Sequence, residues 1–128
     1  MDIFEAIGYK MLQNSEITDV VGTHVYHGYR PESGNPCINY FEVNYEPMYN
    51  GVVERAHYQI SCRATEPGTA QDLARKVCTL FHNMRETVSS FDVQSATVEN
   101  KMLLNEPDTN LWHVPVDIYF TYSEATVS

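Results

Sequence analysis

The sequence predicts an α+β fold: a mostly antiparallel sheet of four to five strands, with two main helices packed on one of its faces. One long segment, residues 65–85, keeps apolar side chains at the spacing of a helix. Residues 53–64 and 111–122 alternate apolar and polar side chains, as half-buried strands do. The order helix, strand, hairpin, helix, hairpin favours antiparallel pairing with one sheet face left open.

The segment 65–85 predicts an amphipathic helix that needs one partner surface. Thr65 can cap its first free N–H groups, and Pro67 suits the first turn. Full burial of a large apolar side chain contributes about 1.5–3 kcal/mol, so we expect this helix to dock against the sheet. The side chains expected to face the sheet are Ala70, Leu73, Ala74, Val77, Leu80, Phe81 and Met84.

The first part of the chain consists of short elements and a loop. Residues 2–12 predict a helix, residues 16–22 a further helical turn ended by a glycine, and residues 23–27 a first strand. Residues 28–36, GYRPESGNP, have the Gly and Pro content of a loop. The side chains expected on the inner side of the first helix are Ile3, Phe4, Ile7, Met11 and Leu12.

Residues 37–45 and 53–64 predict the two strands of a hairpin. The dipeptide at 50–51 is Asn-Gly, which favours a type I′ turn because both residues tolerate a positive φ. Continuing that register along the strands pairs Phe41 with Ile60 and Val43 with Tyr58.

Two features of the first of these strands complicate the register. Pro47 cannot donate to the ladder, so a wider loop over residues 46–52 is equally consistent with the sequence. Ile38 and Tyr40 are apolar on the opposite face from Phe41, which indicates that the strand begins covered on both sides or contains a bulge.

The last part of the chain predicts a second hairpin. Residues 91–104 and 111–122 form its strands, and the turn residues of NEPDTN, 105–110, connect them. Pro115 interrupts the final strand on its outward face, so we expect an edge position or a bulge there.

The composition is that of one soluble domain spanning residues 1–128. Hydrophobic residues make up 43% and charged residues 20%, and no apolar run approaches the ~20 residues of a membrane span. The first residues lack the features of a signal peptide, so we expect a cytoplasmic origin. The net charge of -9 argues against an outer surface that binds nucleic acid. Cys37, Cys62 and Cys78 lack metal-site spacing and are expected to be reduced core residues.

No catalytic, cofactor or metal site is predicted, and we do not expect an enzyme. Cys62 and His57 lie at even and odd positions of one predicted strand, so their side chains point to opposite faces of the sheet. His24 and His27 also differ in parity, and the chain has no HExxH motif. The segment GYRPESG lacks the lysine and the strand-to-helix context of a phosphate loop.

Tyrosine is unusually frequent around the first predicted strands. Two explanations fit this abundance equally well: the preference of sheets for tyrosine, and a protein–protein interface. The tyrosines concerned are Tyr26, Tyr29, Tyr40, Tyr45, Tyr49 and Tyr58.

The layout of the chain resembles the tail terminator (tail completion) proteins of long-tailed bacteriophages. The segments that carry the resemblance are VVGTHVYHGYRPESGNPCINYFE, the strand HYQISCRA, the helix QDLARKVCTLF and the final strand WHVPVDIYFTY. These motifs are patterns of fold and include no catalytic signature. The residues that match are Val21, Gly22, Val25, Tyr26, Pro31, Pro36, Ile38 and Tyr40.

The resemblance implies a structural virion protein at the tail-head junction, assembled in the host cytoplasm. It implies a hexameric ring that caps the tail tube, ends its polymerisation and joins it to the head-side connector of the neck. The implied partners are further copies of the chain, the tail tube protein and the connector protein, with DNA only passing through the lumen and no membrane contact. An acidic lumen would let DNA pass without binding it.

Subunit and tube contacts are expected at the 28–36 loop and the 46–52 hairpin tip, because one patch must meet a different patch for a ring to close. The residues proposed for this interface are His27, Tyr29, Arg30, Tyr45, Glu46, Met48 and Tyr49. A secondary interface with an acidic neighbour is expected on the polar side of the long helix, at Arg75, Lys76, His82 and Arg85.

Two alternatives stay open at the level of sequence. One is another head-tail neck or connector ring protein, which would share the composition and the oligomeric habit. The other is a small α+β enzyme or ligand-binding domain, which predicts a closed pocket with convergent polar groups.

Overall fold

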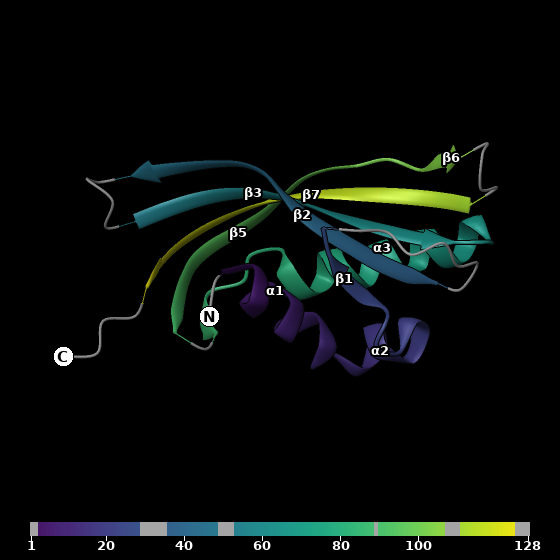
Figure 1. Ribbon diagram of the computed structural model, residues 1–128, viewed down its shortest axis with the longest axis horizontal. Helices are drawn as coiled ribbons and strands as arrows, with labels where there is room; N and C mark the ends of the chain where they lie inside the picture. Colours follow the sequence, from purple (N-terminus) through teal and green to yellow (C-terminus); the bar gives the residue numbers. More distant parts are fainter. Residues whose placement is uncertain (1–2, 29–35, 49–52, 89, 107–110, 125–128) are drawn as a thin grey trace.

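The computed structural model describes residues 3–28, 36–48, 53–88, 90–106 and 111–124, which form one curled sheet with helices on one side (Figure 1). The sheet has seven strands in the order β1-β2-β3-β7-β5-β4, with β6 paired to β7. The strands are β1 (Val25–His27), β2 (Cys37–Met48), β3 (Val53–Ala64), β4 (Glu86–Val88), β5 (Phe91–Lys101), β6 (Leu104–Glu106) and β7 (Leu111–Glu124). The described pairings are antiparallel except that of β1 with β2.

The α+β class and the helices on a single face are confirmed, but the sheet has more strands than the four to five predicted. Strands β4 and β6 have three residues each, too few to show a period of two in the sequence. Strand β6 lies where the predicted strand 91–104 meets the predicted turn 105–110, and β4 lies between the predicted helix 65–85 and that strand. The helices are α1 (Ile3–Leu12), α2 (Ser15–Val21) and α3 (Pro67–Phe81).

Helix α2 follows α1 closely and has a capping residue at each end. The Asn14 side chain accepts a hydrogen bond from the Ile17 N–H at 3.1 Å and so caps the start of α2. Gly22 ends α2 at a φ of 61°, a conformation that glycine adopts at little cost. The prediction for α1 was wrong at Leu12, which is exposed because it lies at the last turn, beyond the sheet surface that buries Met11.

Helix α3 is shorter than the predicted segment 65–85. It begins after Glu66, whose side chain makes no capping bond, so the predicted capping role of Thr65 is wrong. At the other end the chain leaves the helix at His82, and Asn83 adopts a positive φ of 64°. Asparagine is among the residues that tolerate this conformation best after glycine. Met84 is still buried, because the chain turns back towards the core after the helix.

The core lies between α3, α1 and the inner faces of β3 and β7. Phe81 of α3 meets Phe120 of β7 edge to face, with ring centroids 5.4 Å apart. Cys37 and Cys62 are buried and form no disulfide within the described residues, as predicted, whereas Cys78 is only half-buried. Within the described part of the chain, no helix is long and apolar enough to cross a membrane.

The predicted register of the first hairpin is correct in one half and wrong in the other. Tyr45 pairs with Ala56 and Met48 with Val53, as the register of the predicted turn requires. An irregularity between Glu42 and Asn44 then leaves Val43 as an extra residue, so Phe41 pairs with Gln59 instead of Ile60. The bulge turns Ile38 and Tyr40 towards the helices, which accounts for their apolar character.

The prediction that Pro115 marks an edge or a bulge was wrong. Pro115 pairs with Ser61 in the middle of the sheet. On the other side of β7, the ladder with β5 ends at Val116 and the ladder with β6 begins at His113. Pro115 therefore lies opposite the gap between β5 and β6. No backbone carbonyl is paired with it on that side, so its missing N–H costs no ladder hydrogen bond there.

Gly8 provides a test of the packing between α1 and β2. A Cβ atom at Gly8 would lie 2.3 Å from the hydroxyl oxygen of Tyr40, which donates a hydrogen bond to the Phe4 carbonyl at 2.8 Å. We expect Gly8→Ala to lower the free energy of unfolding by about 1–3 kcal/mol through overpacking, measured by urea denaturation. The double variant Gly8→Ala with Tyr40→Phe should lose less free energy of unfolding than the two single variants lose together.

Gly68→Ala is the matched control, because a Cβ atom at this exposed position in the first turn of α3 meets nothing within 4 Å. We expect it to be neutral or to stabilise by up to about 1 kcal/mol. Strict additivity of the Gly8 and Tyr40 changes would contradict the proposed steric conflict.

Candidate functional site

The hairpin of β2 and β3 extends beyond the bulge as an arm whose β2 half is exposed on both faces. Residues Cys37–Tyr40 of β2 are buried, but those from 42 to 47 are exposed. Strand β1 covers the outer edge of β2 only as far as Tyr40. In the part of the chain that the structure describes, the edge of β2 from Phe41 onwards has no strand beside it. An uncovered edge of this kind is a template for pairing with another chain.

Three predicted interface residues lie on this arm. The Tyr45 hydroxyl donates a hydrogen bond to Glu54 Oε1 at 2.6 Å, and Tyr45 is 44% exposed. Glu46 pairs with Arg55 of β3 at 3.3 Å. Met48 ends β2 and is half-buried against the start of β3. The arm thus presents an aromatic ring, a thioether and charges that are already paired within it.

His27 lies apart from the arm. Its ring stacks on Phe4 of α1 with centroids 3.9 Å apart, and it contacts Tyr40, its partner in the β1–β2 register. The structure therefore brings Tyr45, Glu46 and Met48 together and places His27 at the base of β2, beside α1. The predicted residues Tyr29, Arg30 and Tyr49 lie outside the described residues.

A hollow of about 530 Å³ connects the arm with the start of α1. It lies on the helix side of the sheet, and Phe4 joins it to the His27 stack. Its lining residues are Ile3, Phe4, Glu42, Tyr45, Glu54, Tyr58, Phe91, Tyr122 and Glu124. Sequence reasoning missed most of this set, because the hollow forms where α1 and four separate strands meet. The only indication in the sequence was that Tyr58 and Tyr122 both occupy strand positions whose side chains point towards the core.

The tyrosines divide between the two explanations considered for them. Tyr40 and Tyr58 are core residues, and burial together with the nearby Glu5 carboxylate raises the pKa of Tyr40 to about 12. Tyr45 is exposed and Tyr26 half-buried. Sheet preference therefore explains Tyr40 and Tyr58, whereas the exposed Tyr45 suits a contact surface.

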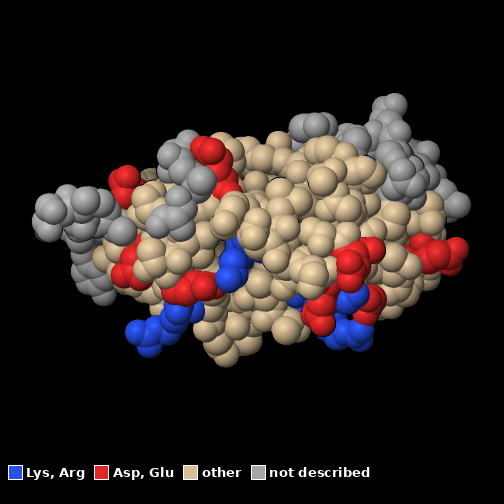
Figure 2. All heavy atoms as spheres, turned by 90° about the horizontal axis from the view of Figure 1, so that it is seen from below, with Lys and Arg blue, Asp and Glu red and all other residues tan. Residues whose placement is uncertain are grey.

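The secondary interface proposed on α3 is less basic than its sequence indicates. Arg75 and Lys76 both pair with Asp72, the latter at 3.1 Å, and the bond to Lys76 lowers the pKa of Asp72. Figure 2, which views the helix side, shows Lys and Arg side chains scattered around a largely uncharged centre, most of them beside Asp or Glu. His82 Nδ1 accepts a hydrogen bond from the Val98 N–H at 3.2 Å, and Arg85 is exposed.

Several polar groups on the outer face of the sheet pair with one another, whereas the buried Ser61 hydroxyl has no hydrogen-bond partner among the described residues. His57 Nε2 and Asp117 Oδ1 are 3.0 Å apart, and Arg55 lies over the Tyr119 ring at 4.5 Å. Cys62 lies on the opposite face, where burial raises the pKa of its thiol. No group of three or more His, Cys, Asp or Glu residues among those described could hold a metal ion.

A free strand edge, a projecting arm and polar groups that are paired internally are features of a structural subunit that acts through contacts with other subunits. The family model described as "Tail completion protein gp17" matches residues 5–123. The chain therefore belongs to this family of phage tail completion proteins, which are structural components of the virion.

Comparison of structures supports the fold. A chain in a structure described as "Virion of native gene transfer agent (GTA) particle" is similar, with a TM-score of 0.75 and 12% sequence identity. The match covers 93% of this chain and 92% of that chain. At this identity the likeness concerns the fold. Among curated proteins, no sequence matches this chain.

The bond between Tyr45 and Glu54 predicts a pH effect on the arm. Donation to the carboxylate raises the pKa of the Tyr45 hydroxyl, because ionisation would lose the bond and place two negative charges together. We expect Glu54→Gln to lower this pKa, measured by NMR titration of ring-labelled tyrosine. The raised folded pKa means that the bond stabilises the arm at neutral pH and is lost as the pH rises through that pKa.

Tyr45→Phe identifies the resonance by its disappearance. An unchanged Tyr45 titration in Glu54→Gln would show that the bond is not formed in solution.

Proposed function

We propose that this chain forms a closed, hexameric ring that caps the tail tube, ends its polymerisation and joins it to the head-side connector. The ring would sit at the tail-head junction after assembly in the host cytoplasm, and we assign the chain no chemical step. The observation that carries this proposal is the arm of β2 and β3, exposed on both faces of β2 and open along its edge. Membership of the tail completion family supports the same role.

The arm suits contact with a tube end for a physical reason. A tube that grows by adding identical subunits exposes the same surface at its end after each addition, so a cap must bind that surface without recreating it. Strand β2 past Tyr40 offers unpaired backbone groups and exposed side chains, while Glu46 is paired with Arg55 within the arm. We assign the tube and subunit contacts to the arm with Tyr45, Glu46, Met48 and Tyr49, and to the 28–36 segment with His27, Tyr29 and Arg30.

The charge of the chain fits a ring through which DNA passes. The chain carries a net charge of -9, and the Lys and Arg residues on the arm and the outer sheet face are paired with carboxylates. Like charge and paired cations both disfavour binding to phosphates. DNA would therefore move through the lumen without being held by it.

The proposal is tested by assembling tail tubes with and without the purified chain. We expect the chain to give six-fold rings in native mass spectrometry and negative-stain images, and to hold tubes at a fixed length. Tubes of unchanged length together with binding to the connector would favour the alternative, a different neck ring protein. A dimer that binds neither would contradict both.

The arm has its own test. We expect the double change Tyr45→Ala and Met48→Ala to let tubes grow past their normal length, because it removes two large side chains from the arm while leaving the core intact. Tyr45→Phe is the matched control, since it keeps the ring and loses only the bond to Glu54. Normal tube lengths with the double variant, at an unchanged melting temperature, would remove the arm from the interface.

A further inference from the structure

Helix α1 carries an exposed stripe that is acidic at one end and apolar along the rest. Glu5, Tyr9 and Leu12 recur at i, i+4 and i+7, so they lie on one face of the helix. Tyr9 is 52% and Leu12 40% exposed. We call these three residues the α1 stripe. Two large apolar side chains exposed side by side on a helix indicate a contact surface.

A groove of the opposite character lies between α3 and the end of β5. Two hollows of about 400 Å³ and 170 Å³ adjoin there, and Lys101 lines both. Apart from Lys101, the groove is lined chiefly by Cys78, His82, Val98, Met102 and Leu103. Met102 is 55% exposed, and Lys101 makes no ion pair with any residue that the structure describes.

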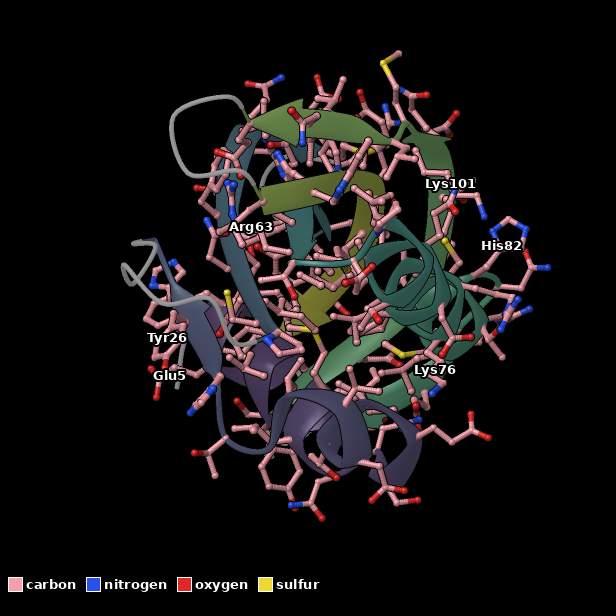
Figure 3. The ribbon with its side chains drawn as sticks, turned by 90° about the vertical axis from the view of Figure 1, so that its right-hand side faces the viewer. Glu5, Tyr26, Arg63, Lys76, His82 and Lys101 are labelled. Atoms are coloured by element: carbon pink, nitrogen blue, oxygen red, sulfur yellow. The ribbon has the colours of Figure 1, made fainter. Side chains whose placement is uncertain are left out.

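The stripe and the groove lie on opposite sides of the molecule. Figure 3 shows Glu5 on one side, and Lys76, His82 and Lys101 on the other. The stripe belongs to α1, which lies beside β1 and also reaches β4 through the pair of Lys10 with Glu86, whereas the groove lies between α3 and the end of β5. A contact between surfaces on opposite sides of identical subunits is head-to-tail, and such contacts close into rings when the rotation allows.

We infer that the α1 stripe of one copy docks in the α3–β5 groove of the next copy, with Glu5 facing Lys101. This inference deepens the proposed ring by naming the two faces that meet, and in that respect it rests on the proposed function. A second copy is the occupant because a single contact then satisfies both surfaces. Tyr9 and Leu12 cover the apolar lining in the way an amphipathic helix binds a groove, and the acid at the end of the stripe neutralises the lysine.

Disulfide cross-linking tests the contact directly. Leu12→Cys and Met102→Cys are placed in one chain that also carries Cys78→Ser, because Cys78 lines the groove. We expect oxidation to give a ladder of covalent multimers, on the free protein at high concentration or on rings bound to tail tubes. Each single cysteine variant should give no ladder. A dimer from Leu12→Cys alone would indicate a two-fold contact between stripes and overturn the inference, as would the absence of a ladder in both samples.

A charge exchange tests the pair without relying on disulfide geometry. We expect Lys101→Glu to weaken self-association about tenfold, and the added change Glu5→Lys to restore most of it, measured by analytical ultracentrifugation. The paired changes Thr87→Glu and Gln94→Glu, at exposed positions outside the groove, make the same change in net charge. An equal loss with this control variant, or no recovery in the Lys101→Glu and Glu5→Lys variant, would overturn the pairing. Melting temperatures confirm that each variant is folded.

The two proposals fail in different ways. A ladder from the paired cysteines without control of tube length would retain the head-to-tail contact and reject the tail role. Normal tube length without a ladder would retain the tail role and reject this contact.

Discussion

The pairing of β3 with β7 is the constraint on which the rest of the structure depends. It runs without irregularity from Glu54 opposite Tyr122 to Ala64 opposite Trp112. The inner side chains of both strands therefore form one continuous apolar surface, and α3 docks on it through contacts such as that of Phe81 with Phe120. A slip of one residue would turn this surface outward, so the neighbouring strands have to adapt to these two.

The adaptation is visible in the strands on either side. Strand β2 contains a bulge at Val43, and β5 is irregular at Gln94 and at Glu99. Bulges bend a strand and increase its twist, which is consistent with the curl of the sheet in Figure 1. The bulge in β2 also divides that strand into a buried base and an exposed arm. The same local feature that fits β2 to the core thus separates the arm from it.

The parts of the fold that could be predicted from the sequence are those encoded locally. The periodicities of residues 65–85, 53–64 and 111–122 identified α3, β3 and β7, because each buries one regular face. The register of β2 before Val43 could not be predicted, since it depends on a tertiary contact, the bond from Tyr40 to the Phe4 carbonyl of α1. Strands β4 and β6 were missed because three residues show no period.

The candidate site was predictable to a similar degree. Turn chemistry and an exposed proline pointed to the hairpin arm, and Tyr45 and Glu46 are exposed there. The hollow beside the arm could not be found, because its lining comes from elements far apart in the sequence. The basic strip on α3 was overestimated, since the sequence alone does not show that Arg75 and Lys76 both pair with Asp72. The effective charge of a helix face depends on which of its charged side chains form ion pairs, and those pairs are known only from the folded structure.

The distribution of charge explains how an acidic chain can assemble selectively with itself. The chain has eight Lys and Arg residues against seventeen Asp and Glu, and most of the described cations are held in pairs within the chain. Copies with a net charge of -9 repel one another at most orientations. Lys101 and Arg85 are the described Lys and Arg residues outside these ion pairs, and Lys101 alone lies in an apolar groove. In the proposed ring, association is therefore favourable only where an acid reaches that lysine and apolar side chains fill the groove, which selects one orientation from many.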